Sequence, residues 1–325
     1  MTTLDRRAPW SDPAWLGEMT AWVDVRLAAL GIHRRGEPAV DRMWARAALL
    51  TFDTDHGPMW AKAVPEVFAH EVAVTILLAD IDPGIVPPVV AAAQGLGRII
   101  TEHVAGPVLA SVRDEPAAWT ATLSRLAEVQ RVLAADRRAL EIAGVAAAPL
   151  AELAEDVPRL LADDALLLVG LPGGLSAAEA AALRARAPEL VDACRALDAV
   201  GIPDSLEHGD LSATQVIVGE MGPVILDWSD GSITHPFLSA ASFLAERRTA
   251  RGPGTVDEVD LIDAYLAPWV TADCVTLAEA RRALDLAGTV LPLHLAALYA
   301  DRVLPGLERP SEHETMVPNA LRSLL

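Results

Sequence analysis

Lysine is almost absent from this chain of 325 residues, which holds 26 Lys and Arg residues together but only one lysine, Lys62. Arginine can keep a protein surface solvated. Its planar fork, however, does not replace the compact ammonium group of lysine as a point charge on a phosphate without rearrangement. The lone lysine is therefore a candidate for a specific role, while survival by chance is the alternative that composition leaves open.

Cysteine and long apolar runs are also scarce. Cys194 and Cys274 lie far apart and fit no metal-binding spacing, so we expect two buried free thiols rather than a catalytic thiol. No uninterrupted apolar run reaches the roughly 18 to 20 residues of a membrane helix. The first residues, MTTLDRRAPWSDP, lack the apolar core of a signal peptide. We therefore expect a cytoplasmic protein with no membrane partner.

Basic residues are few relative to acidic ones, because 26 Lys and Arg face 45 Asp and Glu and leave a net charge of −19. A surface of this sign repels the phosphates of nucleic acid and excludes it as an expected partner. The same charge favours solubility and is compatible with cationic ligands.

Phosphate-binding signatures rich in glycine are missing too. No GxxxxGK[ST] motif occurs, and the segment Trp44–Ala47 between two expected strands holds no glycine. These absences exclude a P-loop and a protein-kinase glycine-rich loop. His70 and Glu71 begin an HExxH zinc-protease pattern, but Val74 stands where the second histidine belongs, so the pattern fails.

What the chain does have is apolar side chains, which make up 52% of its residues and suffice for one large core or two ordinary ones. Lys62 falls on the third of several expected strands. After Pro107 the sequence is rich in Ala and Leu and is expected to be helical to about Val200. The elements predicted from periodicity are helices over 11–30, from about 65 onward, 255–267 and 276–300, and strands over 40–44, 48–52, 59–64 and 98–104.

The stretch from His208 to Asp227, HGDLSATQVIVGEMGPVILD, carries the clearest chemistry. Apolar runs at 216–218 and 224–226 around a turn predict a β-hairpin. Such a hairpin brings Asp210, Gln215 and Asp227 towards the same end of the ribbon. Two carboxylates and an amide oxygen suit a hard cation such as Mg²⁺, and a phosphate-bearing substrate would complete its shell. An ordinary hairpin with acidic caps is the alternative.

This stretch resembles the catalytic core of the aminoglycoside phosphotransferase (phosphotransferase enzyme) family, kinase-like enzymes that act on small molecules. The resemblance rests on His-Gly-Asp, on an amide five positions after that Asp, on the later Asp-Trp pair, and on Lys62 and Glu71. It extends over about residues 40–300 and implies an α/β (α+β) chain with a bilobal protein-kinase-like fold. The implied lobes are a nucleotide-binding lobe over 1–104 and a mostly helical lobe over 105–325 with the catalytic hairpin and the acceptor site.

The resemblance also implies roles for the residues of the hairpin. Asp210 matches the catalytic base that orients the substrate hydroxyl and accepts its proton. His208 matches a histidine that braces the catalytic loop, a role that we favour over general base. Asp227 matches the principal Mg²⁺ ligand, and Gln215 matches the metal-binding amide. The implied cofactor is Mg²⁺ with ATP or GTP as phosphoryl donor.

Nucleotide-binding residues are implied in the first lobe. Lys62 would present its ammonium group to the phosphates and Glu71 would pair with it. Glu102, His103 and Val104 would form the hinge that receives the nucleotide base through backbone hydrogen bonds. A solvated helix residue is the alternative interpretation of Glu71.

The acceptor is less well defined by the sequence. Asp230, Asp257 and Asp260 are candidate substrate contacts, although a run of charge is more often a solvated helix face. The acceptor would be a small hydroxylated molecule, with an aminoglycoside or other amine-bearing antibiotic, a sugar and an amino alcohol all open. We favour a kinase that acts on a metabolite or natural product. Antibiotic resistance is the function of such a kinase when its acceptor is an antibiotic.

Three departures from the family's pattern motivate a second hypothesis. Gln215 stands where the family normally has Asn, Ser212 replaces a common His, and the phosphate loop has no glycine. The longer arm of Gln215 keeps the same carbonyl but shifts its geometry. The alternative function is therefore a catalytically impaired pseudokinase that binds nucleotide or ligand in a regulatory or sequestering role.

Overall fold

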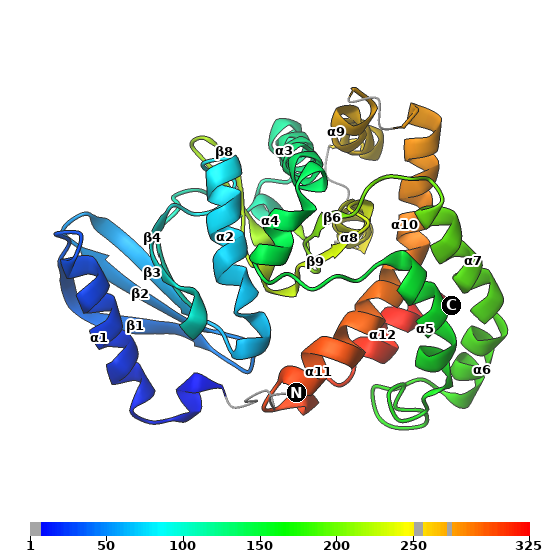
Figure 1. Ribbon diagram of the computed structural model, residues 1–325, viewed down its shortest axis with the longest axis horizontal. Helices are drawn as coiled ribbons and strands as arrows, with labels where there is room; N and C mark the ends of the chain where they lie inside the picture. Colours follow the sequence, from blue (N-terminus) through cyan, green and yellow to red (C-terminus); the bar gives the residue numbers. More distant parts are fainter. Residues whose placement is uncertain (1–7, 250–255, 272–274) are drawn as a thin grey trace.

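The computed structural model describes residues 8–249, 256–271 and 275–325. Within these ranges a β-sheet part and a helical part lie side by side (Figure 1). The sheet has five strands in the order β1-β2-β3-β5-β4, and all neighbours are antiparallel. The strands are β1 (Arg34–Met43), β2 (Ala48–Thr54), β3 (Gly57–Ala63), β4 (Val89–Ala93) and β5 (Arg98–Glu102).

The two faces of the sheet have different partners because side chains alternate along each strand. Leu50 and Ala61 point to one face, which packs on α1 (Trp15–Ala28) in a separate apolar core. The helix residues in that core recur every four positions and are Trp15, Met19, Val23 and Leu27. The intervening residues Leu49 and Lys62 point to the opposite face, which lines a cleft.

The predicted strands are confirmed, but β4 and the first half of β1 were missed. Both are edge strands of the sheet and neither shows a buried alternation, since every residue of β4 is half-buried and most of β1 is exposed. Without a buried face, their sequences carry no period-two apolar signal. The helix predicted over 11–30 is shorter at both ends than expected.

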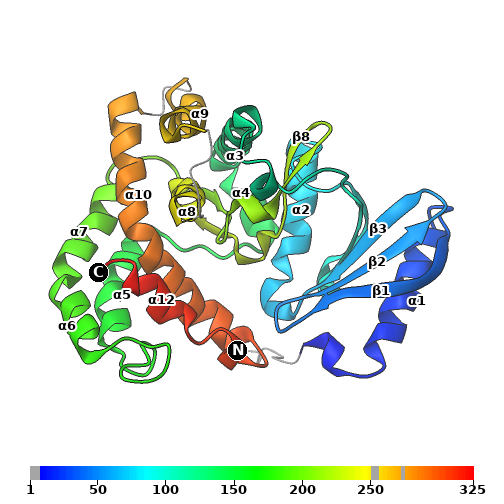
Figure 2. The ribbon, with the colours of Figure 1, turned by 180° about the vertical axis from the view of Figure 1, so that it is seen from behind.

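Helix α2 (His70–Ile81) joins the two parts of the molecule. It follows a short 3-10 helix, η2 (Glu66–Phe68), and contacts both β4 and the 3-10 helix η6 (Trp228–Asp230). Figures 1 and 2 show it between the sheet and the helices. Glu71, in its first turn, is therefore held between the two parts.

The helical part is built around α10 (Leu277–Leu298), which packs against α5, α7, α8, α9 and α12. A π-helical segment, η7 (Tyr299–Val303), continues it into α11 (Leu304–Gly306). The other helices are α3 (Pro116–Ala135), α4 (Arg137–Ile142), α5 (Leu150–Ala162), α6 (Ala177–Ala185), α7 (Ala187–Asp198), α8 (Phe237–Thr249), α9 (Glu258–Thr271) and α12 (Met316–Arg322).

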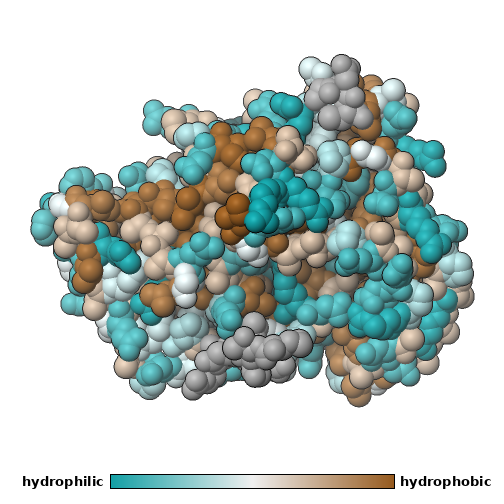
Figure 3. Space-filling view, viewed as in Figure 1, coloured by the Kyte–Doolittle hydropathy of each residue, from teal (hydrophilic) through white to brown (hydrophobic). Residues whose placement is uncertain are grey.

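By length and composition alone, the continuous helix Leu277–Gly306 is the one helix in the described ranges that is apolar enough to cross a membrane. Its most apolar window is 56% buried inside the protein. Together with its five packing partners, this burial is what the core helix of a helical domain shows. On the face seen in Figure 3, hydrophilic side chains cover much of the helical part.

The hairpin predicted around residue 220 is confirmed as β7 (Val216–Gly219) and β8 (Gly222–Ile225). Two further short strands that periodicity did not predict, β6 (Ser205–Glu207) and β9 (Ser232–Thr234), pair beside it. Cys194 is buried and free, as expected, whereas Cys274 and the predicted helix start at 255 lie outside the described residues.

Gln130 ties α3 to three other elements. Its side-chain nitrogen donates to the carbonyl oxygens of Leu206 at 2.8 Å and Pro236 at 3.2 Å, and its oxygen accepts from the Tyr265 hydroxyl at 2.7 Å. The side chain is only 1% exposed. A change to an apolar residue would leave buried carbonyl groups without a donor.

We therefore expect Gln130→Leu to lower the free energy of unfolding by about 2 kcal/mol. Urea unfolding followed by circular dichroism measures this change. Val132→Ala on the exposed side of the same helix is the control and is expected to change stability by less than about 0.5 kcal/mol. Equal stabilities of Gln130→Leu and the unmodified protein would contradict the bracing role.

Candidate active site

A cavity of about 330 Å³ lies between the inner face of the sheet and the β7–β8 hairpin. Residues from β3, α2, the segment after β5, and both ends of the hairpin meet there. The predicted site residues that line it are Lys62, Glu71, Glu102, His103, Val104, Gln215 and Asp227. The structure thus brings all the predicted nucleotide and metal residues to one cavity, and their roles stay predictions.

Apolar side chains from two layers line part of this cavity. Leu49 and Ile99 come from the sheet, and Ile217 and Ile225 come from the hairpin. At the rim, within the described residues, no hydrogen bond uses the backbone N–H of Val104. A flat heterocycle could lie between the apolar layers and accept a hydrogen bond from this N–H group.

Lys62, on the strand between those of Leu49 and Ile99, organises the charged part of the cavity. Its ammonium group donates to Glu71 at 2.6 Å and to Asp227 at 2.8 Å. Although burial disfavours its charged form, these two carboxylates raise the pKa of Lys62 above its usual value. Burial raises the pKa of Glu71 to about 7 against the opposing effect of Lys62. The ion pair that the resemblance implied is therefore present.

Asp227 adopts an unusual backbone conformation, with φ of 63° and ψ of 63°. This left-handed conformation is uncommon for a residue other than glycine, and residues that adopt it cluster at active sites. Burial works against ionisation here, but the ammonium of Lys62 holds the pKa of Asp227 well below its usual range. The carboxylate is therefore charged at neutral pH.

The side-chain oxygens available near Lys62 fit a hard cation. Oδ1 of Asp227 accepts from Lys62 and Ser229, whereas Oδ2 has no partner among the described residues. The side-chain amide of Gln215 also makes no hydrogen bond there, and both residues line the cavity. Within the described ranges no cluster of three His, Cys, Asp or Glu side chains could hold a metal alone. One carboxylate and one amide match an Mg²⁺ ion that substrate phosphates complete.

His208 connects the catalytic loop to the segment before Asp227. Its buried ring contacts the Leu226 carbonyl oxygen through Nε2 at 2.9 Å, and Nδ1 accepts from the backbone N–H of Asp210 at 3.3 Å. This pattern assigns the proton to Nε2. Burial lowers the pKa of His208, so the ring is neutral. The geometry is the bracing arrangement that the resemblance implied.

Gly209 lets the catalytic loop approach the segment after β8. Its φ is +85°, and a Cβ atom built on it would lie 2.3 Å from the Cβ atom of Asp230. No other residue fits this position without moving the backbone. The glycine of the His-Gly-Asp motif therefore sets the distance between Asp210 and the segment that begins with Asp227.

Asp210 is exposed to solvent outside the cavity, but nearby protein atoms exclude part of the water from its carboxyl group. This burial, together with the nearby charge of Asp230, raises the pKa of Asp210 to about 7, while Arg46 acts in the opposite direction. The role of catalytic base that the resemblance implies for Asp210 does not itself require a raised pKa. The carboxyl group is therefore close to its titration point at neutral pH.

Asp230 is buried beside Arg46, and its role in acceptor binding stays a prediction. It is only 2% exposed, and its carboxylate forms an ion pair with Arg46 from the turn between β1 and β2. Sequence reasoning missed Arg46 altogether. The one available signal was its position at the expected phosphate loop. Its partners lie 184 and 253 positions away, and no local pattern predicts contacts over such separations.

Asp257 and Asp260, the other two candidate substrate residues, lie exposed at the start of α9. Asp257 accepts a hydrogen bond from the backbone N–H of Val259, as a helix-capping residue does. Neither carboxylate lines the cavity that holds Lys62. The structure therefore does not bring them to the other predicted site residues, and a role in acceptor binding stays a prediction.

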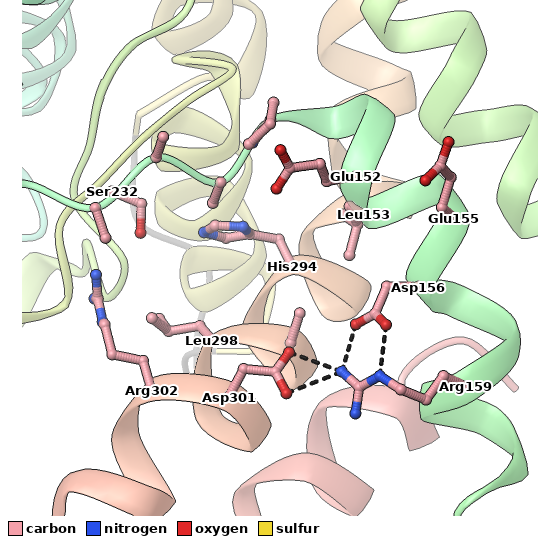
Figure 4. A pocket seen from close by; sticks show the side chains of 15 residues that line it. Glu152, Leu153, Glu155, Asp156, Arg159, Ser232, His294, Leu298, Asp301 and Arg302 are labelled. Atoms are coloured by element: carbon pink, nitrogen blue, oxygen red, sulfur yellow. Dashed lines mark hydrogen bonds and ion pairs between the residues drawn. The ribbon is translucent and has the colours of Figure 1, made fainter. Parts of the chain in front are cut away.

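A second cavity, of about 620 Å³, lies between α5 and α10 in the helical part (Figure 4). Arg159 bridges Asp156 and Asp301 across it, whereas Glu152 and Glu155 have no partner among the described residues. The cavity shares no lining residue with the first one. The structure thus separates it from the predicted phosphoryl-transfer residues.

Two contacts join the second cavity to the catalytic segment. His294 in its wall contacts Glu207, which precedes His208, at 3.3 Å. Arg302 donates to the backbone oxygens of Gly231 at 3.0 Å and Asp230 at 2.5 Å. Helix α10 therefore supports the catalytic loop from behind.

Comparison with known proteins identifies the fold. No family model and no curated protein sequence matches this chain. The chain is similar in structure to a type I macrolide 2'-phosphotransferase, with a TM-score of 0.60 and 14% identity over 94% of this chain and 96% of the other. The macrolide 2'-phosphotransferase MphH from Brachybacterium faecium gives 0.60 and 15% over 92% and 98%. Choline kinase from Cryptosporidium parvum Iowa II gives 0.56 and 12% over 95% and 93%.

At such low identities the likeness shows the fold alone. The chain has the bilobal kinase-like fold of these small-molecule phosphotransferases, as the sequence predicted, with a small antiparallel sheet beside a mostly helical part. The boundary predicted at residues 104 and 105 stays a prediction.

The raised pKa of Asp210 predicts that loss of its charge stabilises the fold at high pH. In the folded protein the Asp210 carboxyl group binds a proton with a pKa of about 7, whereas the ordinary pKa of an aspartate carboxyl group is 3.8. Stability from the bound proton is complete below about pH 4 and is lost as the pH rises through about 7. We expect Asp210→Asn to raise the melting temperature at pH 8 by a few degrees and to have least effect at pH 4.

Thermal unfolding of both proteins at pH 4, 6 and 8 measures this difference. Asp260→Asn, which removes an exposed acid, is the control and is expected to leave the melting temperature unchanged at each pH. A lower melting temperature of Asp210→Asn at pH 8 would show that the carboxylate stabilises the fold and would contradict the prediction.

Proposed function

We propose that this protein transfers the γ-phosphoryl group of a nucleoside triphosphate to a hydroxyl group of a small molecule. One observation carries this proposal: a single cavity is lined by apolar side chains of the sheet and the hairpin together with Lys62, Gln215 and Asp227. Asp210 lies outside the cavity but close enough to Asp227 for their charges to interact. These groups are of the kinds that hold a nucleobase, a triphosphate with its metal ion and an acceptor hydroxyl in phosphoryl transfer.

The nucleotide base would lie between Leu49 and Ile99 on one side and Ile217 and Ile225 on the other. The backbone N–H of Val104 would give it a hydrogen bond, whether the donor is ATP or GTP. The phosphates would then extend towards Lys62, whose ammonium group Glu71 holds in place. An ammonium that two carboxylates position loses little freedom when phosphate binds.

Asp227 and Gln215 would hold Mg²⁺ through Oδ2 and the side-chain amide oxygen. The ion, when bound, would neutralise the negative charge that develops on the phosphates during transfer. The extra methylene of Gln215 compared with Asn gives its amide oxygen a longer reach. Retention of metal binding by this longer side chain separates an active enzyme from a pseudokinase.

Asp210 would accept a hydrogen bond from the acceptor hydroxyl and orient its oxygen towards the γ-phosphorus. A bond forms between that oxygen and phosphorus while the bond from phosphorus to the β–γ bridging oxygen breaks. The nucleoside diphosphate leaves with the electron pair, and the hydroxyl proton passes to Asp210 and then to solvent. His208 stays neutral and holds the loop in place.

The acceptor we favour is a hydroxylated molecule that carries an amine. The net charge of −19 attracts cations over a distance set by ionic strength. Two similar structures are named for a macrolide and one for choline, so the shared fold is compatible with very different acceptors. Aminoglycosides, other amine-bearing natural products and sugars therefore all belong in a first panel.

The test is nucleotide turnover with Mg²⁺ and ATP or GTP across that panel. We expect at least one acceptor to give turnover that Asp210→Ala lowers by roughly 100-fold or more, because the base no longer positions the hydroxyl. The rate of the unmodified protein is expected to fall as the pH drops below about 7, where Asp210 becomes protonated. Nucleotide binding without turnover above that of Asp210→Ala for any acceptor would favour the pseudokinase.

Lys62→Ala is expected to lower nucleotide affinity or the turnover rate by roughly 100-fold, since the phosphates lose a buried cation. Calorimetric nucleotide titration and turnover measure this loss, and circular dichroism shows whether the fold is kept. Arg26→Ala, on the exposed face of α1, removes a cation from the same lobe and is expected to change neither. Unchanged binding and kinetics of Lys62→Ala would refute the role of Lys62.

A further inference from the structure

The turn between β1 and β2 occupies the position of the phosphate loop but contains Ala45, Arg46 and Ala47 instead of glycines. A backbone hydrogen bond from Trp44 N–H to the Ala47 carbonyl at 3.0 Å closes the turn. Ala45 and Ala47 are each 2% exposed, so the turn is packed into the protein rather than open to solvent. Arg46 is its one charged side chain.

The side chain of Arg46 crosses from the sheet to the helical part. One terminal nitrogen donates to the Tyr299 hydroxyl at 2.8 Å, and the other contacts Ser229 at 3.4 Å and the carboxylate of Asp230. The guanidinium carbon also lies 4.7 Å from the ring centre of Phe68. These contacts fix the charge beside the segment that follows Asp227.

Tyr299 owes its position to the π-helical turn in which α10 continues. This turn widens the helix over Tyr299–Val303, and the same turn carries Arg302, which holds the backbone of Asp230. Single π-helical turns of this kind are concentrated at functional sites. The helical part is thus shaped to hold both Asp230 and the guanidinium that pairs with it.

Arg46 keeps donors for a further ligand. A guanidinium has five N–H donors, and the contacts to Tyr299, Ser229 and Asp230 use three of them. The ion pair with Asp230 uses one nitrogen and one oxygen, so it is not the closed two-bond form. Nε and one terminal N–H group therefore have no acceptor within the described residues.

Carboxylates outnumber cations around Arg46. The carboxylates belong to Glu71, Asp210, Asp227 and Asp230, and the cations are Lys62, Arg46 and Arg302. Lys62 lines the nucleotide cavity, whereas Arg46 lies outside it, close enough to both Asp227 and Asp210 for their charges to interact. A γ-phosphoryl group passing from the donor to a hydroxyl at Asp210 would meet Arg46 there.

We propose that Arg46 binds the γ-phosphoryl oxygens of the nucleotide donor, in place of the backbone amides of a glycine-rich loop. The proposal rests on the phosphoryl-transfer function proposed above. Asp230 and Tyr299 hold the guanidinium in position, and its free N–H groups meet the oxygens that gain charge as the phosphorus leaves the diphosphate. Lys62 serves the inner phosphates, and Arg46 serves the outer one.

A contact with the γ-phosphoryl group alone affects ATP and not ADP. The test is therefore calorimetric affinity for ADP and for the β,γ-imido analogue of ATP, both with Mg²⁺. Arg46→Ala alone would leave Asp230 buried and unpaired, which destabilises proteins. The double variant Arg46→Gln with Asp230→Asn removes the ion pair without leaving a buried charge, and circular dichroism checks its fold.

We expect the double variant to bind the ATP analogue roughly tenfold or more weakly while its affinity for ADP changes less than about twofold. Asp230→Asn alone keeps the guanidinium and is expected to keep the preference for the ATP analogue. Arg35→Gln, which removes an exposed cation from β1, the strand before the turn of Arg46, is the matched control and is expected to change neither affinity.

Equal losses for both nucleotides in the double variant, or no loss for either, would overturn the role of Arg46. If that result is found and the unmodified protein still turns over an acceptor, the proposed function stands. A loss of affinity for the ATP analogue alone would support the role of Arg46. If the unmodified protein also turns over no acceptor, the same result counts against the proposed function. If the unmodified protein binds neither nucleotide, both the role of Arg46 and the proposed function are overturned.

Discussion

The ammonium group of Lys62 is the contact on which the rest of the site depends. It joins β3 to α2 through Glu71 and to the segment after β8 through Asp227, over 9 and 165 positions of sequence. Each of these elements carries a different part of the cavity wall. One buried cation between two carboxylates therefore fixes the relative positions of the sheet, the bridging helix and the hairpin, and with them the shape of the cavity.

The same region shows how charge is divided between the two parts of the molecule. The cations Lys62 and Arg46 come from the sheet, whereas Asp210, Asp227 and Asp230 come from the helical part. Each cation is held across the boundary by an acid of the other part. Burial and the excess of carboxylates together raise the pKa of Asp210 to about 7, and a metal ion with a triphosphate would restore the balance of charge.

Much of the fold and of this site could be predicted from the sequence because the signals are local. The hairpin appears as two apolar runs around a turn, and Asp210, Gln215 and Asp227 follow from their spacing to it. The pairing of Lys62 with Glu71 came from the resemblance to a family. Edge strands such as β4 were missed because a half-exposed strand has no buried face to produce alternation.

Other features required contacts that only the folded chain makes. Asp230 looked available to a substrate because its partner Arg46 is remote in sequence and lies in a turn with no recognisable motif. The raised pKa of Asp210 depends on surrounding atoms and on Asp230, neither of which a spacing pattern contains. The need for glycine at position 209 likewise arises from backbone that packs against it.

The scarcity of lysine gives the folded protein an unusual chemical property. Apart from the amino terminus, Lys62 is the one primary amine of the chain, and its side chain is only 16% exposed and paired with two acids. Reagents that acylate amines would reach it through the cavity, and they would react only when the ammonium loses its proton. The rate of acylation at this single position thus reports how often Lys62 leaves its two carboxylates.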